Sequence, residues 1–156
     1  FLKAAVALVD SNLSRLRNDA RSSPNPDAFG ILDELEYITG FGFVACQSYA
    51  TAVASRSQLK NQKREALALG PKHRTGRSMA QLINAAANYW KHSPEWSLET
   101  PADQAQQTIE MISTLGVNID TSYPVAAVLH EILAPHPARF ANLLPFLTQW
   151  RDALPK

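Results

Sequence analysis

The chain has 156 residues, of which 46% are hydrophobic and 19% are charged. This size and composition indicate one folded domain and exclude intrinsic disorder. Its apolar runs are shorter than the roughly 20 residues that a membrane-spanning helix needs. A single cysteine, Cys46, excludes an internal disulfide framework and fits a reducing compartment. We therefore expect a cytoplasmic protein with no membrane contact, no metal and no cofactor. The sequence begins at Phe1 rather than at methionine, so we also expect its native N-terminus to be missing or processed.

The net charge of +1 conceals an uneven distribution of charge along the chain. Eight Lys or Arg residues and one Glu lie between Arg56 and Lys91, a local balance of +7, whereas the rest of the chain carries 7 basic and 13 acidic residues. We call residues 56–92 the basic segment. Two interpretations remain open: the segment packs against helices that carry the acidic positions of residues 33–36, or it meets phosphate or an acidic partner.

Helical periodicity runs through nearly every segment, and no stretch keeps the two-residue period of a strand. An apolar stripe predicts a first helix that ends where two prolines interrupt residues 22–26. A second helix is predicted over residues 27–39, and the glycines at 40 and 42 indicate a corner or a kink. One long helix is then predicted over residues 43–69, because Gly70-Pro71 is a strong stop signal.

The C-terminal half continues the helical pattern. A helix is predicted over residues 77–92 with Thr75 as a cap, and another is opened by Thr100-Pro101 and closed by Gly116. Ser122-Tyr-Pro124 starts a further helix that runs through Leu133, and the last covers residues 138–154 with a bend at Pro145. We therefore predict an all-α bundle of five to seven helices that forms a single domain over residues 1–156.

The helix predicted over residues 77–92 has two distinct faces when residues are placed at intervals of about 100°. The apolar face comprises Met79, Leu82, Ile83, Ala86, Tyr89 and Trp90. The opposite face comprises Arg77, Gln81, Asn84, Asn88, Lys91 and His92. Asparagine is a poor helix former, and this row contains two asparagines and no acid. The row is therefore interpreted either as a solvated surface or as a face that contacts phosphate.

The string Asn88-Tyr-Trp-Lys-His92, followed by Glu95-Trp96, resembles a motif of the HEPN superfamily. Members of that superfamily are compact helical bundles found in toxin–antitoxin and phage-defence systems. Many of them form dimers and cut RNA without a metal, using an Arg that is closely followed by a His. The resemblance therefore implies a helical, RNA-acting protein and a metal-independent endoribonuclease activity.

The same resemblance implies roles for individual side chains. His92 would act as general acid and base, with Asn88 and Lys91 beside it, while Arg77 would hold the phosphate. This sequence departs from the family pattern, since no Arg precedes a His at the family's spacing and Arg77 lies fifteen residues before His92. The resemblance then requires Arg77 to reach the site along the helix or from a second subunit of a homodimer.

Other basic residues are predicted to contact RNA or a partner: Lys60, Lys63, Arg64, Lys72 and Arg74. The main alternative function is a non-catalytic interaction module, in which the basic segment docks an acidic protein partner such as an antitoxin. A third hypothesis is a ligand-binding bundle with an apolar pocket lined by Phe41, Phe43, Tyr49 and Trp90. Cys46 lies in an apolar run and is predicted to be a small buried hydrophobe rather than a nucleophile. The four histidines show no spacing typical of a metal site.

Overall fold

A computed structural model describes residues 1–96 and 102–156 of the chain. Over these ranges the chain forms α-helices, two short 3₁₀ segments and no strand, which confirms the predicted all-α class. The elements are α1 (Leu2–Ser22), α2 (Ile31–Ala54), α3 (Lys63–Ala68), α4 (Met79–His92), η1 (Ser93–Glu95), α5 (Asp103–Ser113), α6 (Pro124–Leu133), η2 (Phe140–Leu143) and α7 (Leu144–Asp152). The seven α-helices of the described ranges also agree with the predicted number. The predicted Thr100-Pro101 helix start lies outside the described residues.

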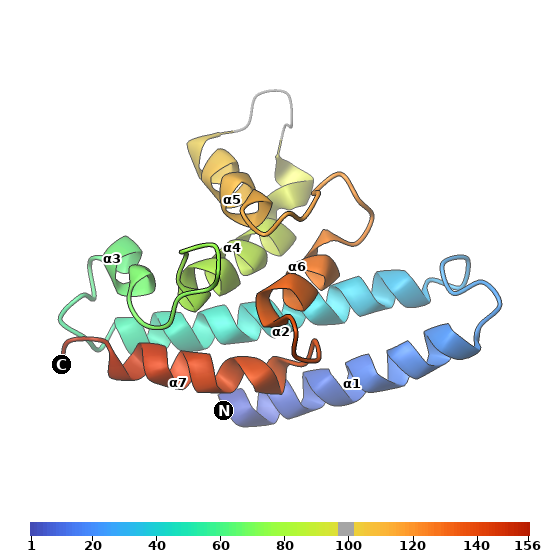
Figure 1. The fold of residues 1–156 in the computed structure, drawn as a ribbon, viewed down its shortest axis with the longest axis horizontal. Helices are drawn as coiled ribbons and strands as arrows, with labels where there is room; N and C mark the ends of the chain where they lie inside the picture. Colours follow the sequence, from blue (N-terminus) through green and yellow to red (C-terminus); the bar gives the residue numbers. More distant parts are fainter. Residues whose placement is uncertain (97–101) are drawn as a thin grey trace.

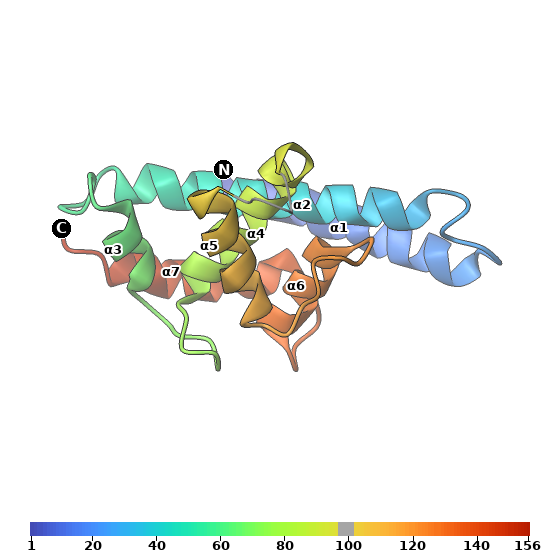
Figure 2. The same ribbon diagram turned by 90° about the horizontal axis from the view of Figure 1, so that it is seen from above.

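Two long antiparallel helices, α1 and α2, form the base of the molecule, and the axis of α7 is roughly parallel to theirs (Figure 1). The apolar stripe of α1 is buried as its periodicity predicts, at Leu2, Val6, Val9, Leu13 and Leu16. Helix α4 crosses α2 and contacts α5, α6 and α7, so it lies at the centre of the packing. Figure 2, seen from above, shows α5 crossing α4 on the side away from α1. None of the helices in the described part of the chain is long and apolar enough to cross a membrane.

The predicted corner at residues 40–42 is wrong, because α2 continues through both glycines and ends at Ala54. The glycines instead allow large side chains to pack against the helix. A Cβ atom added to Gly40 would lie 2.0 Å from Cδ1 of Trp90, and one added to Gly42 would lie 2.5 Å from Cζ of Phe140. The prediction of one helix over residues 43–69 is also wrong, since turns separate Ala54 from α3.

Two other boundaries differ from the sequence-based expectation. Helix α4 is capped by Ser78 rather than by Thr75: the Ser78 hydroxyl accepts from the Gln81 N–H at 3.0 Å, and the Gln81 side-chain oxygen accepts from the Ser78 N–H at 3.0 Å. At the C-terminus, Pro145 lies in the first turn of α7, and the preceding segment is the 3₁₀ turn η2. A proline is tolerated there because a first-turn N–H has no partner within the helix.

The short helix α3 is held against α4 and α7 by a second apolar cluster that includes Ala66, Leu67, Ala80 and Trp150. The indole N–H of Trp150 donates to the Ala66 carbonyl at 2.8 Å, and the Ser78 hydroxyl donates to the Leu67 carbonyl. The buried side of α3 is thereby fixed. Its basic N-terminal residues, Lys63 and Arg64, stay exposed beside α4.

Helix α4 of the basic segment packs against α2, the helix that carries the acidic positions of residues 33–36, but the described contacts of Glu34 and Glu36 are with other elements. Glu34 pairs with Arg15 of α1 at 3.2 Å. The Glu36 carboxylate accepts from the N–H groups of Val125 and Ala126 at the start of α6. Glu34 and Glu36 therefore do not neutralise the basic segment, although α2 and α4 pack together.

Candidate functional site

The middle of the polar row of α4, at Asn84 and Asn88, is half-buried rather than fully solvated, because it faces a buried glutamine of α2. Gln47 has a side chain only 7% exposed. Its amide nitrogen donates to Oδ1 of Asn84 at 2.9 Å and to Oδ1 of Asn88 at 2.7 Å. Its amide oxygen accepts from the Lys91 ammonium at 2.8 Å. One glutamine therefore joins three of the polar residues of α4 in a single network.

Lys91 fixes the orientation of every amide in this network. An ammonium group can only donate hydrogen bonds, so the Gln47 atom that it contacts must be the oxygen. The nitrogen of Gln47 then faces α4, and Asn84 and Asn88 must turn their oxygens toward it. Burial lowers the pKa of Lys91, and the nearby charge of Lys63 lowers it further.

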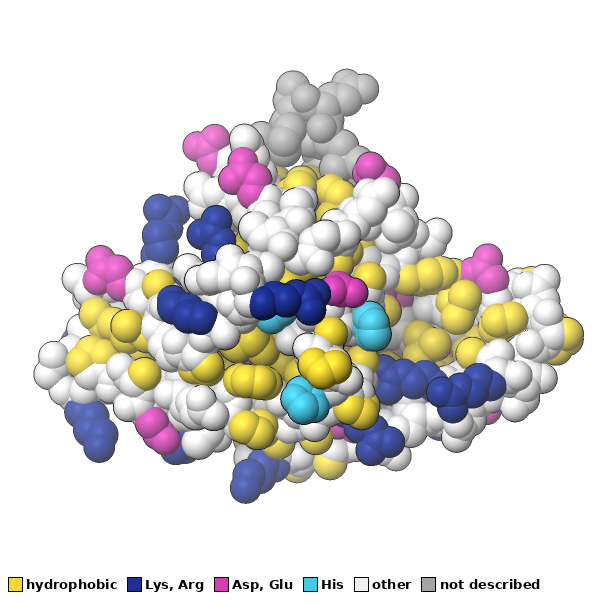
Figure 3. Space-filling model, in the orientation of Figure 1, with side chains coloured by type: hydrophobic (Ala, Val, Ile, Leu, Met, Phe, Trp, Pro, Cys, Tyr) yellow, Lys and Arg dark blue, Asp and Glu magenta, His cyan; other side chains and the backbone are white. Residues whose placement is uncertain are grey.

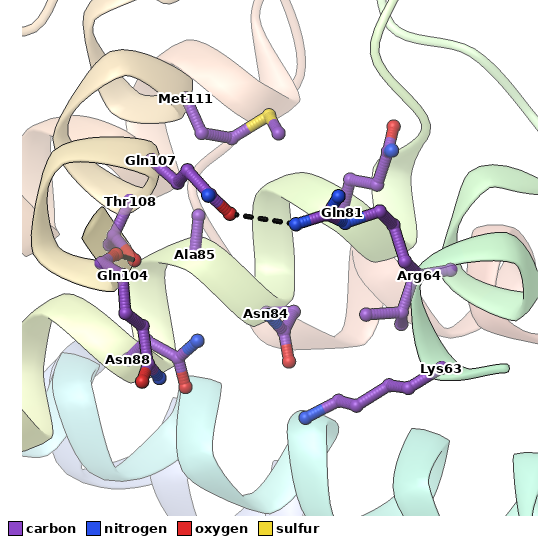
Figure 4. A pocket seen from close by; sticks show the side chains of 11 residues that line it. Lys63, Arg64, Gln81, Asn84, Ala85, Asn88, Gln104, Gln107, Thr108 and Met111 are labelled. Carbon is purple, nitrogen blue, oxygen red and sulfur yellow. Dashed lines mark hydrogen bonds between the residues drawn. The ribbon is translucent and has the colours of Figure 1, made fainter. Parts of the chain in front are cut away.

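On the other side of the same row lies a pocket of about 310 Å³ between α3, α4 and α5. We call it the α3–α4–α5 groove. Figure 4 shows side chains from all three helices converging on it. Its lining comprises Lys63, Arg64, Leu67, Gln81, Asn84, Ala85, Asn88, Gln104, Gln107, Thr108 and Met111. None of these described lining residues is acidic, and two are cationic.

The guanidinium of Arg64 is placed across the groove by α5, since its Nη2 donates to the Gln107 side-chain oxygen at 3.0 Å. Figure 3 shows a group of Lys and Arg side chains on this side of the molecule, near α3. The predicted contact residue Lys60 lines a smaller adjoining pocket with Gln47 and Lys63. The lining of the groove is therefore electropositive.

Two other predicted contact residues lie outside the groove lining. Arg74 forms an ion pair with Glu131 of α6 at 2.7 Å. The Lys72 ammonium donates to the Ala68 carbonyl at the end of α3 at 2.5 Å. Both residues stiffen the connection between α3 and α4 and do not face the amide row.

The predicted catalytic residues do not converge within one chain. Arg77 is exposed just before the start of α4, and His92 is its last residue, about 20 Å away along the helix. The His92 ring lies 3.6 Å from a Glu95 carboxylate oxygen, between Nδ1 and Oε2. The structure thus brings together Asn88 and Lys91 of the predicted set, through Gln47, and leaves Arg77 and His92 at opposite ends of α4.

Three residues of the network and the groove were not singled out from the sequence: Gln47, Gln104 and Gln107. Gln47 stands in an apolar stretch of α2, where an isolated amide carries no motif. A buried polar residue among small apolar ones is the signal that marks it, since such a group requires a hydrogen-bonding partner. The partner itself is visible only in the tertiary structure.

Several other expectations concern reactive or apolar sites. Cys46 is buried, as predicted, and burial raises the pKa of its thiol to about 12, which excludes it as a thiolate nucleophile near neutral pH. No group of three metal-ligating side chains occurs among the described residues. The hypothetical apolar pocket is not formed, because Phe43 packs against Phe140 in the core while Phe41 is 54% exposed.

Comparisons with protein-family models, with curated proteins and with solved structures find no match to this chain. The HEPN resemblance therefore stays a prediction from the sequence. The case for a function comes from the groove and its network.

Proposed function

We propose that this chain is an RNA-binding protein that holds backbone phosphate at the α3–α4–α5 groove. One observation carries the proposal: cations and amides from three helices line a single groove, and no carboxylate is among its described lining residues. Phosphate contacts dominate the affinity of proteins for nucleic acids. The local +7 balance of the basic segment supports the same class of ligand.

Binding does not require the predicted nuclease activity. Cleavage by His92 with phosphate held by Arg77 would need a second subunit, because the two side chains lie at opposite ends of α4. Asn88 and Lys91 belong to the amide network and act in binding under this proposal. Metal-independent cleavage by a homodimer remains the extended form of the same proposal.

The test is the affinity for a labelled single-stranded RNA, measured by fluorescence anisotropy over a range of salt concentrations. A Lys63→Gln/Arg64→Gln variant should bind more weakly. The slope of log affinity against log salt should fall by about 1.4, at about 0.7 for each lost phosphate contact on a single strand. The matched control is Lys3→Gln/Arg56→Gln, which removes the same charge from exposed positions outside the groove.

Equal losses in the two double variants would show non-specific attraction and contradict the proposal. Absence of RNA binding by the parent, together with salt-sensitive binding of an acidic protein, would favour the interaction-module alternative instead. Incubation of the bound RNA without divalent metal, beside a His92→Ala variant, tests cleavage. Intact RNA in both samples would leave a binding protein without nuclease activity.

A further inference from the structure

Four of the five amides that line the groove share one property: their side-chain oxygens already accept a hydrogen bond within the protein. Asn84 and Asn88 each accept a hydrogen bond from Gln47. The Gln81 oxygen accepts from the Ser78 N–H in the capping box of α4. In each case the acceptor is directed toward the protein.

The fourth amide, Gln107, repeats the pattern from the opposite wall. Its side-chain oxygen accepts a hydrogen bond from Arg64 at 3.0 Å, so its side-chain nitrogen is available to donate to a ligand. Among the described residues, the NH₂ groups of Gln81, Asn84, Asn88 and Gln107 donate to no acceptor. Figure 4 shows the oxygens of Asn84 and Asn88 on the α2 side and their nitrogens on the groove side.

The groove therefore offers hydrogen-bond donors and positive charge. Lys63 and Arg64 contribute the charge, and four amides contribute donors whose polarity the protein has already set. Gln104 is the one described lining amide whose oxygen has no donor, and its exposed side chain is able to rotate. A ligand complementary to such a lining is an anion with several acceptor oxygens and no donors of its own.

We infer that the α3–α4–α5 groove is a binding site for a single phosphate group, lined mainly by hydrogen-bond donors, and that Lys91 sets the polarity of this lining through Gln47 without contacting the ligand. This inference rests on the proposed function and adds the ligand's chemical class and a positioning residue. A terminal phosphate offers three acceptor oxygens against the two of a carboxylate, so it can pair with more of the lining donors. At about 310 Å³ the groove also accommodates the sugar attached to that phosphate.

The role of Lys91 follows from the donor-only character of an ammonium group. If Lys91 is replaced by a residue that cannot donate, nothing holds the Gln47 oxygen in place, and the Gln47 amide is free to turn over. Asn84 and Asn88 would then present their oxygens to the groove, where they would repel phosphate. Arginine at position 91 keeps a donor and should keep the polarity.

The sharpest test is Gln47→Glu, which preserves shape and reverses the network. A carboxylate at this position accepts from Lys91 and also from α4, so Asn84 and Asn88 must rotate their nitrogens toward α2 and their oxygens into the groove. The probes are inorganic phosphate and uridine monophosphate, titrated by calorimetry at neutral pH. We expect Gln47→Glu and Lys91→Met to weaken phosphate binding about tenfold or more, since two charge-assisted hydrogen bonds are lost.

Two controls separate polarity from charge and from folding. Gln149→Glu adds the same negative charge on exposed α7, away from the groove, and should leave binding nearly unchanged. Lys91→Arg should restore affinity relative to Lys91→Met. The side-chain NH₂ resonances of Asn84 and Asn88 should shift with phosphate in the parent and not in Gln47→Glu, whereas thermal unfolding should show that both proteins are folded.

The inference is overturned if folded Gln47→Glu binds phosphate as tightly as the parent, or if the parent binds neither phosphate nor uridine monophosphate at millimolar concentrations. RNA binding by the parent in that second case would leave the proposed function standing with a different contact surface. Phosphate binding without RNA binding would support the phosphate site and contradict the proposed function. The ligand of the site would then be a small phosphate compound.

Discussion

At the scale of single residues, glycine is used here for close packing inside a helix. Gly40 and Gly42 stand in the middle of α2, where glycine weakens a helix by about 1 kcal/mol relative to alanine. The side chains that need the space are Trp90 of α4 and Phe140 of η2. The cost in helix propensity is therefore offset by the close contact of α2 with two other elements.

Gly40→Ala should lower the free energy of unfolding. The new Cβ would lie 2.0 Å from the Trp90 ring, and overpacking of this kind costs about 1–3 kcal/mol. Thermal unfolding and the near-ultraviolet circular dichroism of the tryptophans measure the effect. Ser48→Ala, at an exposed position of the same helix, is the matched control and should change stability by less than about 0.5 kcal/mol. A Gly40→Ala protein that melts above the parent would contradict this account of the glycine.

At the scale of elements, the long helices supply carboxylates that cap later segments. Asp10 of α1 accepts from the N–H groups of Phe140 and Ala141 at 2.7 and 2.9 Å. Glu36 of α2 accepts from the first N–H groups of α6 at 2.6 and 2.8 Å. Neither η2 nor α6 has a side-chain cap of its own. Helix N-termini carry unpaired donors and a partial positive charge, so an acid from another helix both satisfies and docks them.

Glu36→Ala should destabilise the fold by about 1–3 kcal/mol, because two N–H groups of α6 lose their charged acceptor. Burial raises the pKa of Glu36 above its usual value, although the two backbone hydrogen bonds act in the opposite direction. Urea denaturation of the variant measures the loss. Asp33→Ala, which removes an exposed acid three residues before Glu36, should be nearly neutral. Equal midpoints for the two variants would show that α6 is held by apolar packing alone.

At the scale of the whole molecule, the loop of residues 69–78 between α3 and α4 contacts α6, which is distant from it in the sequence. The His73 ring contacts the Glu131 carbonyl through Nε2 at 3.3 Å, and its Nδ1 accepts from the Thr75 N–H at 3.3 Å. Arg74 pairs with the carboxylate of the same Glu131. The Thr75 contact requires an unprotonated Nδ1, so the folded protein favours the neutral ring.

Stability should therefore fall with acid through His73. Burial, and secondarily the charge of Arg74, lower the pKa of His73 in the folded state, although the Glu131 carbonyl raises it. The unfolded chain then binds a proton more readily, and this contribution to stability is lost as the pH falls below about 6.5. Melting temperatures measured between pH 8 and 5 should decline less for His73→Gln than for the parent, by about a few degrees at most. His136→Gln, at an exposed histidine, should behave as the parent does. Identical slopes of melting temperature against pH for all three proteins would contradict the assignment to His73.

The sequence by itself determined the features that depend on neighbours along the chain. Apolar residues at spacings of three and four require a helix with one buried stripe, and α1 buries the residues that this rule selects. Proline pairs end helices through local geometry, so the break after α1 is also readable. The two faces of α4 follow from the same periodicity, with Leu82 and Ile83 in the core and Asn84 and Asn88 on the polar side.

The tertiary structure decided what those faces meet. A glycine in a helical pattern signals either a turn or a close contact, and only the arrival of Trp90 on Gly40 distinguishes the two. The sequence leaves the polar row of α4 open to interpretation as a solvated or a functional face, and only the tertiary structure shows Gln47 opposite Asn84 and Asn88. Periodicity specifies which side of a helix is buried but not its partner, because the partner is selected by packing between residues distant in sequence. For the same reason only the fold could show that the groove residues converge while Arg77 and His92 do not.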